Sequence, residues 1–359
     1  MVTTQGFKYA GSKRLLIPQI LDLVRSTGAR HVWDAFSGTT RVSQALAQSG
    51  FQVTSSDAAL WSEVLGTCYL LNRSDASEYT ELIAHLNAVP PVDGWFTEHY
   101  GGTEADQKKP FQRHNTRRLD GIRAEIDRLR LDTVTRCVAL TSLMLALDEV
   151  DSTLGHFASY LRQWAPRSYK TLELKVPHLF RNEKRNHVLR GDVFDLAERL
   201  PEPVDLAYLD PPYGSNNAKM PPSRVRYAAY YHFWTTLIQN DQPEVFGKAS
   251  RRCDSRDLES ASVFEEFRRD EHGRFIAVEA IRRLLRTVPA RWLVLSYSSG
   301  GRATAEELLD AIEACGTLRQ TLKIDYRQNV MAGMQWTREW LRETPVRHQE
   351  FLFLVERDS

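Results

Sequence analysis

The segment HVWDAFSGTTRVSQALAQSGFQVTSSD (31–57) decides the fold. Its first six residues form an apolar, β-branched and aromatic run that predicts a strand, and QVTSSD (52–57) predicts a second one. A tight turn at Gly38 joins the first strand to a helix expected over 41–49. This succession indicates one β-α-β unit of a parallel sheet.

The alternation continues along the chain. Apolar runs at 187–192, 204–210, 291–298 and 350–356 predict further strands, and TAEELLDAIEAC (304–315) predicts a helix that opens with a threonine cap. We therefore expect an α/β fold built on a doubly wound sheet.

Two interruptions break this alternation. Helices are predicted over 62–71, 78–87, 117–130 and 134–147, which indicates a helical insertion at 60–179. A second insertion spans 215–287. The expected core then comprises residues 1–59 and 180–359.

Composition limits the class of protein. The chain has 359 residues, of which 42% are hydrophobic and 26% charged, values that exclude a disordered or fibrous chain. We expect a cytoplasmic protein, because no run approaches the roughly 18 apolar residues of a membrane span and the first residues lack the apolar region of a secretory signal. The four cysteines lie far apart without metal-ligand spacing, so we expect neither zinc nor disulfides.

The most informative motif is VDLAYLDPPYG (204–214). A strand ends at Asp210, and Pro211 and Pro212 prevent further sheet pairing, which holds the carboxylate at the carboxyl edge where open α/β sheets bind ligands. The Asp210 carboxylate and the Pro211 carbonyl together suit both hydrogens of an exocyclic amine, and Tyr213 offers a ring to stack on the base. The competing interpretation is a plain Pro-Pro turn.

Gly38 and Asp57 suggest a nucleoside site. Gly38 allows a ligand to approach the backbone, and Asp57 ends the next strand about twenty residues on, where an acid suits ribose hydroxyls. The turn has one glycine where a dinucleotide site has three, so a nucleoside without phosphates fits better. An ordinary strand-to-helix turn remains an alternative for Gly38.

Positive charge is local. Lys and Arg number 47 against 46 Asp and Glu, a net charge of +1, so nucleic-acid contacts depend on clusters. KKPFQRHNTRR (108–118), RNEKRNHVLR (181–190) and GKASRRCDSR (247–256) are such clusters, and RVRYAAYYHFW (224–234) mixes cations with aromatic rings. Solvated faces, and a core stripe for Phe233 and Trp234, are the alternatives. The candidate nucleic-acid contacts are Lys108, Lys109, Arg113, Arg224, Arg226, Tyr227, Lys248, Arg251 and Arg252.

The ordered motifs FKYAGSK (7–13), DAFSGTT (34–40), SSD (55–57), GDVFDL (191–196) and DPPYG (210–214) resemble the D12-class, Dam-type DNA adenine-N6 methyltransferases. The resemblance implies a Rossmann-like methyltransferase sheet and S-adenosylmethionine as cofactor. It also implies double-stranded DNA as substrate and allows a cognate restriction nuclease as partner.

The resemblance carries roles over to particular residues. Catalysis falls to Asp210, Pro211, Pro212 and Tyr213, around an adenine extruded from the duplex. Cofactor binding falls to Tyr9, Ala10, Gly11, Lys13, Asp34, Phe36, Ser37, Gly38, Asp57, Asp192, Val193 and Asp210.

Two alternatives remain open. One is methylation of an exocyclic amine in structured RNA, and the other is a nucleic-acid-binding module without catalysis. Lys13, Asp57, Asp192 and the whole Asp210–Tyr213 motif are present, which argues against the second.

Overall fold

The central feature of the computed structural model is a seven-stranded sheet. The structure describes residues 2–103, 105, 109–161, 163–214, 226–256, 262–266, 268–325 and 349–358. Within them the strands follow the order β10-β11-β9-β6-β1-β2-β5. Their bounds are His31–Asp34 (β1), Gln52–Asp57 (β2), His187–Arg190 (β5), Leu206–Leu209 (β6), Trp292–Ser298 (β9), Gly316–Asp325 (β10) and Gln349–Arg357 (β11).

The sheet is mostly parallel, which confirms the predicted α/β fold. β6 pairs in parallel with both β1 and β9, and β2 pairs in parallel with β5, whereas β11 lies antiparallel between β9 and β10. Numbered by chain order, the sheet strands run 3-2-1-4-5-7-6. This is a doubly wound order with an antiparallel last strand inserted, and its direction reverses between β1 and β6.

Contacts divide the chain into two compact units. The first comprises Met1–Ile17, Ser37–Asp192 and Tyr227–Ser260, and the second comprises Pro18–Phe36, Val193–Arg226 and Ala261–Ser359. The division expected from the sequence, a core of residues 1–59 and 180–359 with insertions at 60–179 and 215–287, stays a prediction.

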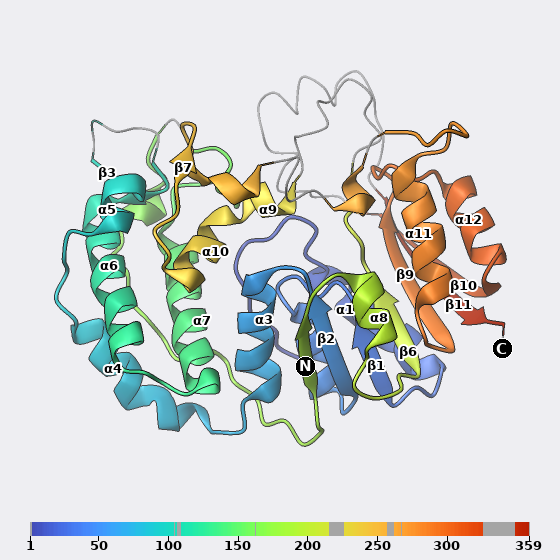
Figure 1. Cartoon of the computed structure of the whole chain (residues 1–359). Coiled ribbons are helices and arrows are strands. Elements are labelled where there is room, and N and C mark those ends of the chain that lie inside the picture. The colour runs from blue at the N-terminus through green and yellow to red at the C-terminus, as the bar shows by residue number, and fades with distance from the viewer. Residues whose placement is uncertain are drawn as a thin grey trace. The chain divides into compact units, whose positions relative to one another are not determined.

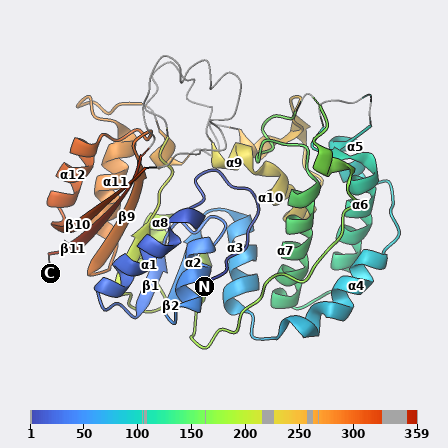
Figure 2. The same cartoon turned by 180° about the vertical axis from the view of Figure 1, so that it is seen from behind.

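In the second unit, helices cover both faces of the strands. α8 (Val193–Glu198), α11 (Ile276–Thr287) and α12 (Ala305–Glu313) lie on the near face in Figure 1, and α1 (Ile17–Ser26) lies in front in Figure 2. β9 is buried from Leu293 to Tyr297 as a result. Thr304 caps α12 through the predicted capping box with Glu307.

The first unit adds a group of helices to β2 and β5. Its helices are α2 (Arg41–Gln48), α3 (Leu60–Gly66), α4 (Thr80–Ala88), α5 (Trp95–Tyr100), α6 (Arg113–Arg128), α7 (Thr133–Val150), α9 (Tyr227–Tyr230) and α10 (His232–Gln239). Figure 1 shows α4, α5, α6 and α7 side by side. Short strand pairs join Gly101–Gly102 (β3) to Phe111–Gln112 (β4) and Val245–Phe246 (β7) to Arg251–Arg252 (β8).

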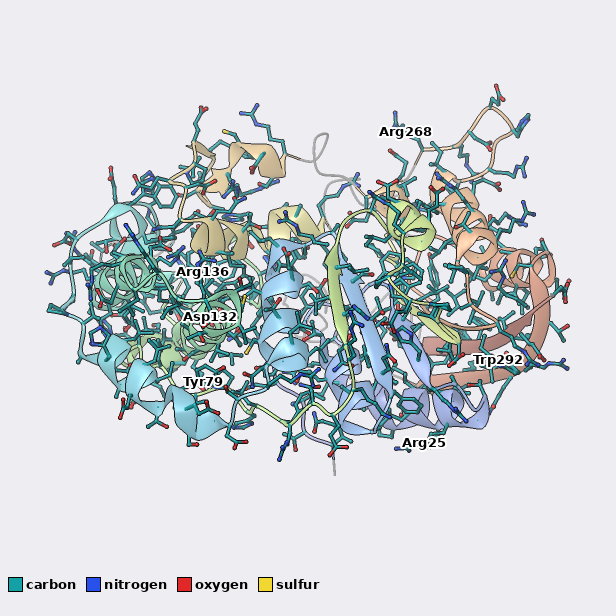
Figure 3. The ribbon with its side chains drawn as sticks, turned by 60° about the horizontal axis from the view of Figure 1, so that its bottom comes forward. Arg25, Tyr79, Asp132, Arg136, Arg268 and Trp292 are labelled. Atoms are coloured by element: carbon teal, nitrogen blue, oxygen red, sulfur yellow. The ribbon has the colours of Figure 1, made fainter. Side chains whose placement is uncertain are left out.

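Side chains explain two of these helices. Asp132, labelled in Figure 3, starts α7 because its carboxylate accepts the N–H groups of Val134 and Thr135 at 3.0 and 3.1 Å. On α10, Phe233 and Trp234 are 0% and 1% exposed, which confirms the core stripe considered as an alternative for them.

Two elements differ from what the sequence predicts. The expected helix at 62–71 is an α-helix only to Gly66 and continues as a π-helical turn from Thr67 to Leu71. β10 was not predicted, because its side chains alternate only between exposed and half-buried positions and the run carries no apolar face strong enough to mark a strand.

No helix among the described residues is long and apolar enough to cross a bilayer. The same residues contain no cluster of three or more His, Cys, Asp or Glu side chains arranged to hold a metal ion.

Candidate active site

Two acids lie at the ends of the neighbouring strands β1 and β6, where the strand order of the sheet reverses. β1 pairs in parallel with β6, and Asp34, the last residue of β1, stands opposite Tyr208. Asp210 lies two residues beyond Tyr208, just past the end of β6. Asp34 is fully buried, whereas Asp210 is half-buried. Both carboxylates therefore lie at the carboxyl edge, beside the switch point at which doubly wound sheets bind ligands.

The segment after Asp210 is fixed by hydrogen bonds from β9 and the loop that follows it. The backbone carbonyl of Tyr213 accepts the N–H of Arg302 at 2.7 Å and the hydroxyl of Tyr297 at 3.3 Å. The rings of Tyr213 and Tyr297 pack with centroids 4.7 Å apart and planes tilted by 50°. Tyr297 on β9 and Arg302 in the next loop thus hold Tyr213 in place.

The Tyr213 hydroxyl contacts the acid predicted to be catalytic. It donates a hydrogen bond to Asp210 Oδ1 and lies 3.2 Å from Ser296 Oγ and 3.5 Å from Glu350 Oε2. Burial and the nearby Asp210 charge raise the pKa of Tyr213 well above its ordinary value, so the phenol stays protonated. The sequence predicted only a stacking role for the Tyr213 ring, and in the structure its hydroxyl also has a partner.

Aromatic side chains gather near the start of α8 in the second unit. Phe36 meets Phe264 edge to face at 5.3 Å, and Phe194 stacks on Phe264 at 5.8 Å. Val193 is buried. These apolar surfaces suit a planar base, and they bring two of the predicted cofactor residues, Phe36 and Val193, into an apolar setting. Sequence reasoning missed Phe264, which lies in the second predicted insertion.

In the first unit, Asp57 holds the turn at Gly38. Its Oδ2 accepts the Gly38 N–H at 2.8 Å, and its Oδ1 accepts the Ala59 N–H at 2.9 Å. Gly38 has φ of +48°, in the region that favours glycine. Burial raises the pKa of Asp57, and the backbone hydrogen bonds act in the opposite direction. The predicted ribose acid is therefore also the structural anchor of the turn.

The other residues predicted around this turn have separate settings. Ser37 is buried, and both its N–H and its hydroxyl donate to the Ser56 carbonyl at 2.9 Å. Asp192 is exposed, and the neighbouring Gly191 donates its N–H to the Asp57 carbonyl at 3.1 Å.

The segment around Ala10 is held by tyrosines of α9 and the residue after it. The Ala10 N–H donates to the Tyr231 hydroxyl at 2.7 Å, and the Tyr227 hydroxyl donates to the Ala10 carbonyl at 3.3 Å. Tyr9 stacks on Tyr231 with centroids 4.8 Å apart. A Cβ added at Gly38 would lie 3.0 Å from the Tyr9 ring, so the absence of a side chain at Gly38 makes room for Tyr9.

Two lysines complete this segment. Lys13 is buried and donates to the Gly11 carbonyl at 3.0 Å, where Gly11 has φ of +81°. Lys8 Nζ lies 2.8 Å from Asp151 Oδ1 and 3.3 Å from Asp148 Oδ1, at the end of α7. Burial has the largest effect on Asp148 and raises its pKa to about 6. Sequence reasoning missed both acids.

The candidate nucleic-acid residues have different surroundings. Arg252 is 4% exposed and pairs with Asp241 at 2.8 Å and with Asp254 at 2.7 Å. The phosphate contact expected of Arg252 stays a prediction, and two carboxylates already pair with its buried charge. Lys248 is exposed.

The remaining candidates are tied to neighbours or lie outside the described residues. Lys109 donates to the His99 carbonyl at 2.7 Å, Arg113 pairs with Asp93 at 2.8 Å, and Arg251 donates to the Ser255 carbonyl at 2.7 Å. Arg226 is buried, and Tyr227 contacts Ala10. Lys108 and Arg224 lie outside the described residues.

Comparison with known proteins gives the same family as the motifs. The chain is 26% identical over 341 residues to modification methylase StsI of Streptococcus sanguinis, covering 89% of this chain and 48% of that protein. It is 25% identical to type II methyltransferase M.NlaIII of Neisseria lactamica, covering 82% of each chain. It is 23% identical to modification methylase LlaI of Lactococcus lactis subsp. lactis, covering 84% of this chain and 48% of that protein.

This chain thus spans about half the length of two of these curated relatives. The family described as D12 class N6 adenine-specific DNA methyltransferase matches residues 9–259, a range that contains every motif on which the sequence resemblance rests except the first two residues of FKYAGSK. The chain belongs to the D12 class N6 adenine-specific DNA methyltransferase family.

Proposed function

We propose that this chain transfers a methyl group from S-adenosylmethionine to the N6 amine of an adenine within a specific sequence of duplex DNA. The observation that carries the proposal is the position of Asp210. It follows β6 directly beside the switch point and is rigidly continued by Pro211, Pro212 and Tyr213. Family membership supplies the reaction class.

The chemistry asked of Asp210 is to activate a poor nucleophile. The lone pair of the adenine amine is delocalised into the ring. If Asp210 and the Pro211 carbonyl each accept one of the amine hydrogens, the nitrogen is drawn toward tetrahedral geometry and its lone pair becomes available. Tyr213 donates a hydrogen bond to Oδ1 of the same carboxylate, which orients Asp210 for this contact. Catalysis is then by orientation and electrostatics, without a covalent enzyme intermediate.

The residues of the cofactor set fit S-adenosylmethionine. An ionised carboxylate has about four acceptor positions, and Asp57 accepts hydrogen bonds from the backbone of Gly38, Ala58 and Ala59, which leaves acceptor capacity for a ribose hydroxyl. Asp192 and Val193 would hold the adenine ring. When bound, the cofactor supplies a methyl group on positively charged sulfur.

The methionine end of the cofactor would be held by residues from two sequence motifs. These are Tyr9, Ala10, Gly11, Lys13, Asp34, Phe36, Ser37 and Gly38.

Methylation sequencing of single DNA molecules from cells that express the chain tests the proposal. The expected result is N6-methyladenine at one recognition sequence, absent from cells that express Asp210→Ala. Tritiated methyl incorporation into duplex DNA and into total RNA tests the alternative polymer. Label in RNA alone would replace the DNA assignment, and no label in either would favour a binding module.

A cognate restriction nuclease is a further proposed partner, because relatives of this chain are named modification methylases. A DNA substrate would also place the activity at the bacterial nucleoid. If such a nuclease exists, DNA from expressing cells should resist it at the methylated sequence, and unprotected DNA would remove this partner.

Contact with DNA phosphates is proposed for the exposed Lys248. Its loss should flatten the dependence of DNA binding on salt by about one unit of slope. Arg252→Ala is the matched comparison, since Arg252 lies nearby in sequence but is buried between carboxylates. That variant should lose stability by about 1 to 3 kcal/mol, because Arg252 makes charge-assisted hydrogen bonds to both carboxylates. An unchanged slope for Lys248→Ala would place the phosphate contacts elsewhere.

A further inference from the structure

Glu350 is an acid near the proposed target site that no sequence motif marks. It lies on β11, where it stands opposite Ser298 of β9 in the antiparallel register. Its side chain is half-buried, and its Oε2 atom is 3.5 Å from the Tyr213 hydroxyl, at the outer limit of a hydrogen bond. Glu350 thus approaches the Asp210–Tyr213 motif from a strand about 140 residues further along the chain.

The Tyr213 hydroxyl connects two carboxylates. A phenol has one proton to donate, and ionised carboxylates only accept hydrogen bonds. In the structure this proton goes to Asp210, while Ser296 Oγ and Glu350 Oε2 lie 3.2 and 3.5 Å from the same oxygen. A rotation about the C–O bond of Tyr213 would direct the same proton to Glu350. The hydroxyl therefore has two anionic acceptors to choose between.

The field around this hydroxyl is negative. After burial, the charges of Asp210 and Glu350 are the next causes that raise the pKa of Tyr213. Burial also raises the pKa of Tyr208, with Asp210, Asp34 and Glu350 as the contributing charges. Asp210 and Glu350 thus act on both phenols, and Asp34 acts on Tyr208 as well. A cation that formed beside Asp210 would be stabilised by the same field.

We propose that Glu350 is a positioning residue of the target-amine site, acting on Asp210 through the hydroxyl of Tyr213. The assignment rests on the proposed function. As the amine nitrogen bonds to the methyl carbon and the methyl–sulfur bond breaks, the nitrogen becomes positively charged and must release one proton. Asp210 accepts that proton, and the Tyr213 hydroxyl then turns its own proton to Glu350. Glu350 thereby stabilises the state in which Asp210 is protonated.

The test compares Glu350→Gln, Glu350→Asp and wild type in single-turnover methylation of a cognate duplex across pH. Glu356→Gln is the matched control, because Glu356 lies on the same strand but pairs with Arg291 and Arg319. Each variant is also made in a Tyr213→Phe background. Thermal unfolding and calorimetric titration with S-adenosylmethionine check folding and cofactor binding without relying on activity.

We expect Glu350→Gln to lower the single-turnover rate about tenfold with unchanged cofactor affinity, and Glu350→Asp to recover part of the loss. Removing a neighbouring negative charge should also move the acid limb of the pH profile to lower pH. In the Tyr213→Phe background the effect should shrink to less than about threefold, because the connecting hydroxyl is gone.

Full activity of a folded Glu350→Gln would overturn the assignment alone. An equal loss with and without the Tyr213 hydroxyl would do the same, since Glu350 would then not act through it. A loss of cofactor affinity or of thermal stability that accounts for the reduced rate would make the role merely structural. A wild-type chain that methylates no duplex DNA would instead overturn the proposed function and this assignment with it.

Discussion

The two compact units fix their candidate site residues by different means. In the first unit, Ala10 is held through its own backbone groups by tyrosine hydroxyls, and Gly38 is held by its N–H on Asp57. In the second unit, side chains hold one another, because the Tyr213 hydroxyl donates to Asp210 and lies near Glu350. The first arrangement fixes the path of the chain, and the second fixes the direction of a carboxylate.

This difference separates binding from chemistry. A backbone held in place presents a surface for a ligand, so its loss should weaken affinity while leaving the reacting groups intact. A carboxylate held by a hydroxyl is aimed at one atom, so its loss should lower the rate at saturating cofactor. Substitutions in the two units should therefore divide between affinity and rate.

Asp210 should give the largest effect. Asp210→Ala removes the acceptor aimed at the target amine, and we expect single-turnover methylation to fall by about 10²- to 10³-fold. Cofactor affinity should change much less, because the proposed contacts of the first unit remain. Asp210→Asn keeps the shape and one acceptor oxygen, so it should retain more activity than Asp210→Ala. A folded Asp210→Ala with more than about a tenth of wild-type turnover would remove Asp210 from the chemistry.

Both the hydroxyl and the ring of Tyr213 should contribute to the methylation rate. Tyr213→Phe removes the donor to Asp210 and should cost about ten- to a hundredfold in rate, as expected for a hydrogen bond to a charged group. Tyr213→Ala should lose more, because stacking on an extruded base contributes about 1 to 3 kcal/mol.

Matched and mismatched duplexes separate these two parts of the Tyr213 effect. The additional loss in Tyr213→Ala should shrink when the target adenine is mismatched, since an unpaired base costs less to extrude. The loss in Tyr213→Phe should stay the same on both substrates. Equal losses for the two variants on every duplex would mean that only the hydroxyl matters.

The sequence predicted the acids but not their partners. Asp57 and Asp210 could be found because each ends a predicted strand and is followed by a turn, a local signal, whereas Asp34 was found through the family resemblance. The contacts of Tyr213 with Ser296 and Glu350 join residues 83 and 137 positions apart. Such pairs depend on which strands become neighbours in the sheet, and no periodicity in one sequence contains that information.

Three-dimensional packing gives two surroundings that the local sequence does not indicate. Ser296 and Tyr297, on β9, lie against Tyr213. Arg252 belongs to a cluster that reads as a basic surface, yet its side chain is buried between carboxylates. Asp241 and Asp254 lie within eleven residues of Arg252, so these nearby acids were the signal that could have suggested such pairing.

Asp57 tests the binding side of the comparison. Asp57→Ala removes the proposed ribose acceptor and two acceptors of backbone N–H groups, so S-adenosylmethionine binding should weaken by about 1 to 3 kcal/mol. Asp57→Asn should be intermediate, because one of its two positions becomes a donor facing a backbone N–H. Calorimetric titration measures both, with Asp22→Ala on the exposed face of α1 as the control. Unchanged affinity in folded Asp57→Ala would exclude Asp57 from the cofactor site.

Asp148 is a largely buried acid beside Lys8, in the part of the first unit that is otherwise held through backbone groups. Substituting it should change the free energy of unfolding. Burial raises its pKa to about 6 from an ordinary 3.8, so the folded chain binds this proton more tightly than the unfolded chain. Its contribution to stability is complete below about pH 4 and is lost as pH rises through about 6. Lys8 opposes the shift but does not cancel it, because burial has the larger effect and the charge of Asp151 also raises the pKa of Asp148.

Asp148→Asn mimics the protonated acid, so the variant should lack this pH dependence and exceed wild type by about 1 to 3 kcal/mol in unfolding free energy at pH 8. Urea unfolding at pH 4, 6 and 8 measures the difference. Glu149→Gln is the control, because Glu149 is exposed and its pair with Lys175 should contribute less than about 1 kcal/mol at every pH. If Asp148→Asn were the less stable protein at pH 8, attraction to Lys8 would outweigh the cost of burying the charge. The segment before Tyr9 would then be held by a side-chain interaction, as Asp210 is in the second unit.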